Sequence, residues 1–376
     1  MTDPMLDVFF HPDVLSMRVP DGLFEKPASP LLAHQMPFAE GPERIANIRA
    51  VLERAPSAHR FRWHEGRPAT DAEITRFHTP EYLRMLEDAD ATGRWLTDTT
   101  CLPAGGMRAV RAGAGTVMAA LEAILSGQTR LAYALVRPPG HHAARDVADG
   151  YCFLNGVAMA AEHARDAGCA RVAVVDWDVH HGNGTQAGFY ARDDVLTISV
   201  HMNHGPWSPD SHPQTGEVDE TGTGAGLGYN LNLPLPFGSG DAATVALIRQ
   251  IVLPALRRFA PNLIIVANGQ DASQFDPNGR QLLSMAGFHA MAALLAEVAD
   301  ATAHGLLIAQ EGGYNPAYTG FCAYATALGF LRAPLDLPDP LAYYPEDAAA
   351  AAQAVAALIA RHPLLDEGGQ WRPEGA

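Results

Sequence analysis

Arg171-Val-Ala-Val-Val-Asp-Trp-Asp-Val-His-His-Gly-Asn-Gly184 joins an apolar run to a dense group of polar side chains. The apolar run is nearly all β-branched or small, which is typical of a strand buried on both faces of a parallel sheet. Ligands of such sheets bind at the carboxyl ends of the strands, where this polar group lies. Asp178 and His180 stand two residues apart, so in extended backbone they project to the same side and can bind one cation. The stretch therefore predicts a parallel sheet with an active site at the end of this strand.

Apolar, β-rich segments recur along the chain, and helical patterns separate many of them. We expect strands at Leu6 to His11, Phe61 to His64, Leu131 to Arg137, Arg171 to Asp178, Val195 to His201, Tyr229 to Leu235, Leu263 to Asn268 and Leu306 to Gln310. We expect helices at Met107 to Leu125, Asn155 to Ala167, Asp241 to Phe259, Ser284 to Ala303 and Asp347 to Arg361, with Asp241 and Ser284 as N-caps. Parallel strands need crossovers, so this alternation predicts an α/β fold with helices on both faces of the sheet.

The composition bounds the class of protein. An α/β chain of 376 residues often forms one unit, so we expect a single domain over 1–376. No apolar stretch reaches the roughly 20 residues that span a bilayer, and Met1 to Met5 does not begin a secretory signal, so we expect a cytoplasmic protein without a membrane span. The net charge of -16 repels phosphate backbones, which argues against direct nucleic-acid binding. The 4 cysteines form no CxxC pair, which argues against a thiolate zinc site and a disulfide framework.

A hydrolytic site with one metal ion needs ligands, a base for water and a donor for the developing oxyanion. Asp271 follows the predicted strand Leu263 to Asn268, so it can join Asp178 and His180 at the same edge of the sheet. Two carboxylates and one imidazole suit Zn(II), and also Fe(II) or Mn(II). Zinc is the favoured ion.

Two adjacent histidines follow another predicted strand, in Arg137-Pro-Pro-Gly-His-His142. A neutral His142 can take a proton from water, whereas His141, if it pairs with a buried carboxylate such as Asp176, is cationic. For His142 the chain offers the uncharged Asn183 instead. The pair therefore predicts shared proton transfer and electrostatic work beside the metal.

Two aromatic motifs complete the predicted site. Glu311-Gly-Gly-Tyr314 follows the last predicted strand, and Tyr314 can donate a hydrogen bond to the oxygen that becomes negative in a tetrahedral intermediate. Gly150-Tyr-Cys-Phe153 precedes a helix and can place an aromatic wall beside the metal, although ordinary core packing explains these rings equally well. The long loops Pro20 to Pro42 and Asn203 to Gly228 lack periodicity and are candidates to line the site.

Together these motifs resemble the histone deacetylase and acetylpolyamine amidohydrolase superfamily. The motifs are Arg137-Pro-Pro-Gly-His-His142, Gly150-Tyr-Cys-Phe-Leu-Asn155, Asp176-Trp-Asp-Val-His-His-Gly-Asn-Gly-Thr-Gln186 and Glu311-Gly-Gly-Tyr314. Asn183 stands where class I members carry aspartate, so the likeness is strongest to class II and bacterial members. It implies a single-domain arginase-like α/β fold with an eight-stranded parallel sheet and long loops at the strand C-terminal ends. It also implies a zinc-dependent amidohydrolase that releases acetate, or another carboxylate, from an N-acylated primary amine.

The resemblance also implies roles for individual residues. Zinc would be held by Asp178, His180 and Asp271. The catalytic residues would be the tandem histidines His141 and His142, Asp176 and Asn183 behind them, and Tyr314 on the amide carbonyl. A potassium ion beneath the zinc would map to Asp176, Asp178, His180 and Ser199, and a second one to carbonyl groups around Phe189, Arg192, Val195 and Tyr229.

The candidate substrate residues are Gly150, Tyr151, Asp98, Trp207 and Asn278. Asn278 stands where polyamine-selective relatives carry a glutamate, and the missing charge argues against polyamine specificity. Trp207 is a candidate channel wall, with surface packing as the alternative, and Asp98 is a candidate for binding substrate backbone at the rim. Gln270 places an amide beside the third ligand, where many relatives carry phenylalanine.

Several functions remain open at this point. The leading hypothesis is a deacylase acting on acyl-lysine in a peptide or protein, and the alternative is a deacetylase of small acylated amines such as polyamines. An arginase-like ureohydrolase would need further aspartates for a second metal ion. A catalytically silent acyl-group binder is disfavoured, because every expected catalytic side chain is present. The sequence leaves open whether the chain forms a homo-oligomer.

Overall fold

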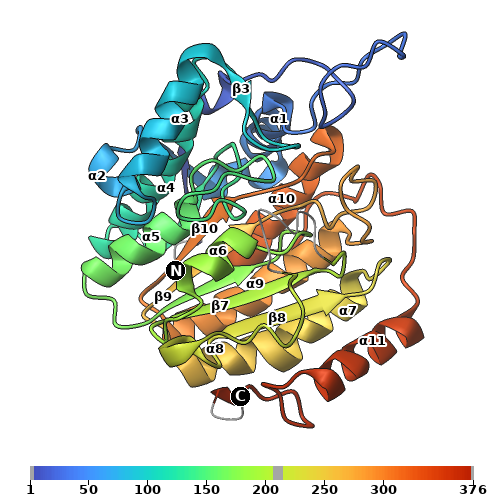
Figure 1. The fold of residues 1–376 in the computed structure, drawn as a ribbon. Coiled ribbons are helices and arrows are strands. Elements are labelled where there is room, and N and C mark those ends of the chain that lie inside the picture. The colour runs from blue at the N-terminus through green and yellow to red at the C-terminus, as the bar shows by residue number, and fades with distance from the viewer. Residues whose placement is uncertain (1–3, 206–214, 374–376) are drawn as a thin grey trace.

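A parallel sheet forms the centre of the computed structural model, which describes residues 4–205 and 215–373 (Figure 1). Within these ranges the sheet has 8 strands in the order β2-β1-β5-β10-β9-β6-β7-β8, and every neighbouring pair is parallel. The strands are β1 Leu6–Phe10, β2 Phe61–Glu65, β5 Leu131–Ala134, β6 Val172–Asp176, β7 Val195–Met202, β8 Asn230–Leu235, β9 Leu263–Asn268 and β10 Gly305–Gln310. The predicted α/β fold is therefore confirmed, strand by strand. A small antiparallel pair, β3 Arg94–Trp95 and β4 Cys101–Leu102, lies apart from the sheet.

Helices cover both faces of the sheet. The longer helices are α1 Pro42–Arg54, α3 Pro80–Thr92, α4 Met107–Leu125, α5 Gly156–Asp166, α9 Met285–Thr302, α10 Pro316–Phe330 and α11 Ala348–Arg361. The shorter ones are α2 Asp71–Ile74, α6 Asn183–Phe189, α7 Asp241–Leu247 and α8 Leu253–Phe259, with the π-helical turn η4 Ile248–Val252 between the last two. Single 3-10 turns occur at η1 Pro12–Leu15, η2 Pro56–Arg60 and η3 Gly224–Gly226.

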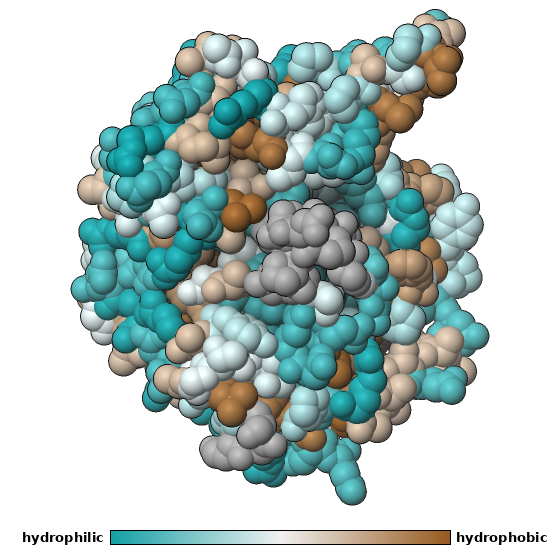
Figure 2. Space-filling view, viewed as in Figure 1, coloured by the Kyte–Doolittle hydropathy of each residue, from teal (hydrophilic) through white to brown (hydrophobic). Residues whose placement is uncertain are grey.

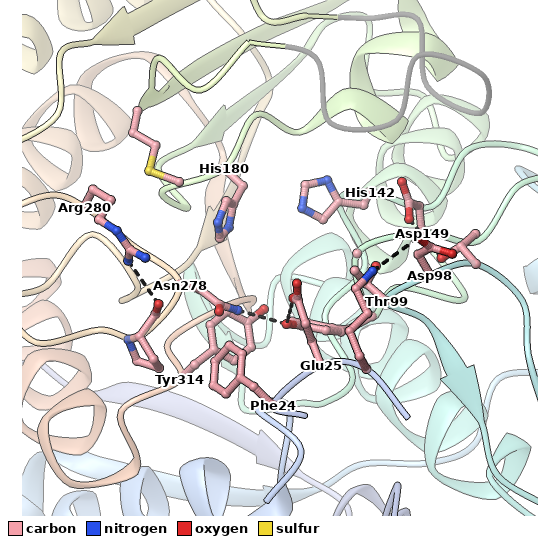
Figure 3. Close-up of a pocket in the computed structure, with 16 residues that line it drawn as sticks. Phe24, Glu25, Asp98, Thr99, His142, Asp149, His180, Asn278, Arg280 and Tyr314 are labelled. Atoms are coloured by element: carbon pink, nitrogen blue, oxygen red, sulfur yellow. Dashed lines mark hydrogen bonds and ion pairs between the residues drawn. The ribbon is translucent and has the colours of Figure 1, made fainter. Parts of the chain in front are cut away.

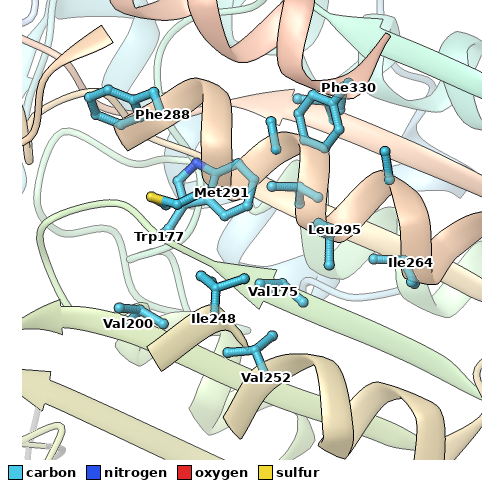
Figure 4. Packing of buried hydrophobic residues seen from close by; sticks show 14 of the residues in the cluster. Val175, Trp177, Val200, Ile248, Val252, Ile264, Phe288, Met291, Leu295 and Phe330 are labelled. Atoms are coloured by element: carbon cyan, nitrogen blue, oxygen red, sulfur yellow. The ribbon is translucent and has the colours of Figure 1, made fainter. Parts of the chain in front are cut away.

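Strand β9 shows why the sheet needs two helical layers. Successive side chains of a strand point to opposite faces, and all of Leu263–Asn268 is buried. Ile264 and Val266 pack in the core that α9 and α10 cover, whereas Ile265 and Ala267 pack in the core that α4 and α5 cover. Figure 4 shows the first of these cores, where Ile264 lies near the side chains of α9. Double burial accounts for the continuous apolar sequence of the central strands.

Removing apolar volume from the centre of the sheet should be costly. We expect Ile265→Ala to lower the free energy of unfolding by about 2–5 kcal/mol, because a buried large-to-small change loses transfer energy and leaves a cavity. Ile265 is 0% exposed, whereas Leu31 is 91% exposed. Leu31→Ala is the matched control and should change stability by less than about 0.5 kcal/mol. Denaturant titration of both variants measures the difference, and similar values for the two would contradict the central position of Ile265.

Three of the longer helices, α1, α3 and α10, lie in segments where the sequence predicts no helix. Each begins with a proline, at Pro42, Pro80 and Pro316. The side chains of Thr79 and Asn315 cap the latter two by accepting hydrogen bonds from backbone amides of the first turn. A proline after a capping residue is a known helix start signal, so these starts could have been recognised.

The prediction that Asp241 is an N-cap is wrong. Asp241 is the first residue of α7, and its carboxylate accepts hydrogen bonds from the Ser284 amide and hydroxyl, at 2.8 and 2.5 Å. The free amides at the start of α7 donate instead to Glu346, which is distant in sequence. Ser284 caps α9 as predicted, through a 3.2 Å hydrogen bond from the Ala286 amide. Asp241 therefore joins the starts of two helices.

The segment between η1 and α1 extends away from the rest of the molecule (Figure 1). It exposes Leu31 and Met36, and the space-filling view shows apolar surface at the tip of the projection (Figure 2). Its inner part, by contrast, lies against the carboxyl edge of the sheet, where it contributes to the site described below. No helix in the described ranges is long and apolar enough to cross a membrane. The cysteines, all of which are described, are free thiols.

Candidate active site

The predicted site residues meet at the carboxyl edge of the four central strands. β5, β10, β9 and β6 are neighbours in the sheet, and parallel strands end at the same edge. The loops that follow these strands carry, respectively, the tandem histidines, Tyr314, Asp271 and the pair Asp178 and His180. The order of the strands, which the sequence does not state, thus brings residues from four distant motifs together.

Asp178, His180 and Asp271 form a buried group whose ligand atoms all lie within 4.8 Å of one another. Backbone amides hold both carboxylates in place. Asp178 Oδ2 accepts from the Gly312 amide at 2.8 Å, and Asp271 Oδ1 accepts from the Val179 amide at 2.9 Å. Backbone groups of the loops that follow β6 and β10 therefore fix the positions of both carboxylates.

The chemistry of this group fits a divalent cation. Asp271 Oδ2 is buried and accepts no hydrogen bond from the described residues, although His180 Nδ1 lies 3.2 Å away. Burial, together with the neighbouring Asp178 carboxylate, raises the pKa of Asp271 to about 8. Two buried carboxylates that face each other are costly unless a positive charge lies between them. Oxygen and imidazole nitrogen ligands suit zinc and similar ions.

The two histidines have opposite electrostatic surroundings, although their ring centres are 4.0 Å apart. His141 Nδ1 lies 2.9 Å from Asp176 Oδ2. Burial disfavours its charged form, but Asp178 and Asp176 outweigh burial and hold the pKa of His141 well above its ordinary value. His142 Nδ1 lies 2.7 Å from Asn183 Oδ1, and burial and the charge of His141 hold the pKa of His142 well below its ordinary value. The surroundings therefore favour the charged form of His141 and the neutral form of His142.

Tyr314 is buried against the same group of side chains. The Tyr151 ring contacts it edge-on at 5.3 Å between centres, and the Arg44 guanidinium lies 5.3 Å from its ring centre. Its amide donates to Asp276 Oδ2 at 2.6 Å, so Asp276 helps to place the loop that carries it. Burial and Asp178 raise the pKa of the Tyr314 phenol well above its usual range, so the hydroxyl stays protonated and can donate.

A cavity of about 760 Å³ opens onto these groups (Figure 3). Its lining includes His142, His180 and Tyr314 from the predicted catalytic and metal residues. It also includes the four predicted substrate residues that the structure describes, namely Asp98, Gly150, Tyr151 and Asn278. Trp207 lies outside the described residues. Asp98 is 98% exposed and pairs with Lys26 at 3.3 Å, which places it at the rim.

Sequence reasoning did not single out Phe24, Glu25 or Lys26, which also line the cavity. They belong to the loop 20–42, which was predicted to line the site, but no motif marks them individually. Met202, the last residue of β7, and Arg280, from the loop between β9 and α9, were also missed. Asp276 was overlooked beside Asn278, although an aspartate before Pro-Asn-Gly is typical of a side chain that binds backbone amides.

Gly150 lies directly against the ring of His142, one of the predicted catalytic residues. Its φ is +51°, and a Cβ atom built on it would overlap the His142 ring. We therefore expect Gly150→Ala to lower kcat/KM by on the order of 100-fold, since a small misplacement of a catalytic group has that effect. Gly127→Ala, which also has positive φ but meets no atom within 4 Å, controls for backbone strain. Steady-state kinetics with circular dichroism of both variants checks the result, and equal activities would contradict close packing on His142.

The Gln270 side chain belongs to a buried polar layer next to Asp271. Gln270 is fully buried, and its Oε1 accepts from Gln310 Nε2 at 2.7 Å. Gln310 Oε1 in turn accepts from the Tyr133 hydroxyl. The amide that replaces phenylalanine at position 270 therefore has a hydrogen-bonding partner in Gln310. Gln270, Gln310 and Tyr133 together form a polar layer between β5, β9 and β10.

The residues named for potassium occupy two neighbouring regions. Ser199 pairs with Asp176 across β6 and β7, and its Oγ lies 2.9 Å from His201 Nδ1. In the second region, the Phe189 carbonyl accepts from the Arg192 amide at 2.9 Å, and the Tyr229 carbonyl accepts from the Thr197 amide at 3.1 Å. Val195 begins β7 beside them.

Fold and site together define an α/β metallohydrolase with a candidate one-metal centre at the sheet edge. The model of the histone deacetylase domain family matches residues 38–329. Histone deacetylase 8 of Arabidopsis thaliana is 44% identical over 96% of this chain and 97% of its own length, and a histone deacetylase-like amidohydrolase of Pseudomonas aeruginosa is 40% identical over 76% and 75%. The crystal structure of the HDA15 HD domain superposes with a TM-score of 0.80 at 30% identity, covering 95% of this chain and 94% of that one. The chain belongs to the histone deacetylase family, whose members hydrolyse amide bonds.

Proposed function

We propose that this chain is a zinc-dependent deacylase that hydrolyses an N-acylated primary amine, such as acyl-lysine, and releases acetate or another carboxylate. The observation that carries the proposal is the buried group of Asp178, His180 and Asp271, which reaches through His180 the cavity that His142 and Tyr314 also line. These are the parts that a metal-assisted amide hydrolysis requires. An arginase-like reaction would need further aspartate ligands for a second metal ion, whereas this group contains two aspartates and one histidine.

Zinc bound by Asp178, His180 and Asp271 would supply Lewis-acid polarisation of the carbonyl and a lowered pKa for water. The protein residues supply proton transfer. With Nδ1 of His142 donating to Asn183 Oδ1, Nε2 carries no proton of its own and can take one from the attacking water. The cationic His141, held by Asp176, lies beside this ring and stabilises the negative charge that develops.

Tyr314 acts on the other side of the reacting carbonyl. Its neutral phenol donates a hydrogen bond to the oxygen that becomes negative, and this donor is worth more in the transition state than in the ground state. As the tetrahedral intermediate breaks down, the proton taken by His142 passes to the leaving amine nitrogen. The products are then a carboxylic acid and a primary amine.

The proposed organisation is a single catalytic domain over 1–376 with two structural potassium ions. The inner ion would lie near Asp176, Asp178, His180 and Ser199, and the outer one near the carbonyl groups of Phe189, Arg192, Val195 and Tyr229. Support for the inner site is the pairing of Ser199 with Asp176 beneath the metal group.

The test is kcat/KM of the zinc-loaded protein on an acetyl-lysine peptide, a longer acyl-lysine peptide and an acetylated polyamine. We expect turnover that is lost with chelator and restored with zinc. Preference for either peptide would establish lysine deacylation, and preference for the polyamine would establish a small-molecule deacetylase. Binding of all three amides without turnover would contradict the proposal and indicate a silent acyl-group binder.

A small acylated amine is the second candidate substrate because of one observation. The cavity wall contains the carboxylate of Glu25, which is linked to Asn278 through the Tyr151 hydroxyl. Position 278 itself carries no acidic side chain. A negative charge in this part of the wall favours a substrate that carries a cation.

A further inference from the structure

Glu25 brings a carboxylate into the cavity wall from a segment that no motif marks. Its Oε2 accepts a hydrogen bond from Tyr151 Oη at 2.7 Å. The same Tyr151 oxygen accepts from Asn278 Nδ2 at 3.0 Å. Figure 3 shows Glu25 and Asn278 on the side of the cavity where Tyr314 lies, and its dashed lines include the hydrogen bonds that join each of them to the Tyr151 hydroxyl. The three side chains form one hydrogen-bonded row, Asn278-Tyr151-Glu25, that ends in a negative charge.

The cationic side chains of the cavity are engaged by other partners. Lys26 Nζ lies 3.3 Å from Asp98 Oδ2 at the rim. Arg280 donates to the backbone carbonyl groups of Pro277 and Gly279, at 3.0 and 2.5 Å. The phenol that contacts Glu25 is neutral, because burial and the nearby Glu25 carboxylate raise the pKa of Tyr151 well above its usual range.

Glu25 therefore retains both charge and capacity for hydrogen bonding. An ionised carboxylate has about four lone-pair sites, and the Tyr151 hydroxyl occupies one of them. Glu25 is half-buried, so its field in the cavity is screened less than that of the exposed Asp98. A ligand ammonium inside the cavity would find an acceptor whose position Tyr151 and Asn278 fix in advance.

We propose that Glu25 selects substrates with a second, cationic amine beyond the amide that is hydrolysed, and that Tyr151 and Asn278 hold it in position. This inference rests on the proposed deacylase function. An acylated diamine or polyamine has the required chemistry, whereas an acyl-lysine within a peptide continues into neutral backbone. The absence of glutamate at 278 is thus offset by a carboxylate that reaches the same wall from another segment.

The test compares monoacetylated cadaverine with the analogue in which a hydroxyl replaces its free amine. For the wild type, kcat/KM of the cationic compound should exceed that of the neutral analogue by on the order of tenfold. This factor corresponds to an energy between the Coulomb energies expected for one ion pair in bulk water and near a protein surface. In Glu25→Gln the ratio should fall to near unity, while kcat/KM for the neutral analogue stays nearly unchanged. Glutamine keeps an oxygen that accepts from Tyr151, so the row of side chains remains. Asp21→Asn, an exposed residue of the same segment, makes the same change in net charge and should leave the ratio unchanged.

Calorimetric binding of both compounds separates this inference from the proposed function. A cation preference in binding that Glu25→Gln abolishes supports the role of Glu25 even if neither compound turns over, and the missing turnover would then count against the deacylase function alone. An unchanged ratio in Glu25→Gln overturns the inference. Equal losses for both compounds also overturn it, because they assign Glu25 to holding Tyr151 rather than to selecting a cation.

Discussion

Tyr314→Phe should lower kcat by about 10²- to 10³-fold, the usual effect of removing one oxyanion donor. The substitution removes only the hydroxyl, so the ring can keep its contacts with Tyr151 and Arg44. The Asp276 hydrogen bond is made by the backbone amide of residue 314 and remains as well. We therefore expect an unaltered metal content and nearly unaltered substrate binding, because the lost interaction belongs to the transition state.

The matched control is Tyr324→Phe, which also removes a buried hydroxyl. Tyr324 Oη donates to Asp336 at 2.7 Å and accepts from the Ser57 amide at 3.1 Å, outside the cavity. This variant should lose about 1 kcal/mol of stability and keep its activity. Steady-state kinetics and metal analysis of both variants decide the matter. Full turnover by Tyr314→Phe would refute the oxyanion role, and a loss of bound metal would show that the ring supports the metal group instead.

The strands were predictable because burial on both faces leaves a direct mark in the sequence. β6 and β9 are continuous apolar runs, and the predicted ranges include them. Helices α1 and α3 were missed because they bury one side only and mix charged with apolar residues. Their starts at Pro42 and Pro80 were the readable signal.

Site residues were predictable where one short motif holds several of them. Asp178 and His180 are two residues apart, and their shared direction follows from extended backbone. The hydrogen bond between Glu25 and Tyr151, in contrast, joins residues 126 positions apart. Nothing in the local pattern of the 20–42 loop states which side chain turns inward. The sequence also did not state the order of the strands, which places four separate motifs at one edge.

A buried ion cluster links the end of the 20–42 loop to the rest of the site. Glu40 lies 2.7 Å from an Arg137 nitrogen and 3.1 Å from Arg44 Nε, and all three side chains are almost fully buried. Arg44 also donates to the Glu311 carbonyl at 2.8 Å, and the Glu311 carboxylate accepts from the Gly140 amide at 2.6 Å. These contacts connect the loops that carry the tandem histidines and Tyr314. Because removing one partner would leave a buried charge unpaired, the cluster is costly to break. It therefore holds the two loops in a fixed position relative to each other.

Asp271→Asn should abolish tight metal binding and lower kcat/KM by roughly a thousandfold, since metal catalysis supplies several kcal/mol and about 1.4 kcal/mol is a factor of ten. Asparagine has nearly the same shape, and its oxygen can still accept from the Val179 amide, as Asp271 Oδ1 does at 2.9 Å. The fold should therefore survive. In the metal-free state the variant should be at least as stable as the wild type, because one of two neighbouring buried carboxylates is gone.

Metal titration monitored by thermal unfolding distinguishes this loss from general damage. The wild-type Tm should rise as zinc is added, because a ligand that binds the folded state stabilises it. The Tm of Asp271→Asn should not respond, and dialysed protein should contain little zinc. Asp166→Asn, whose side chain is 65% exposed and pairs with Arg76, should behave as the wild type. Stoichiometric zinc and a normal Tm response in Asp271→Asn would show that Asp271 is not a zinc ligand. Asp178 and His180 alone would then be too few protein ligands for the proposed centre.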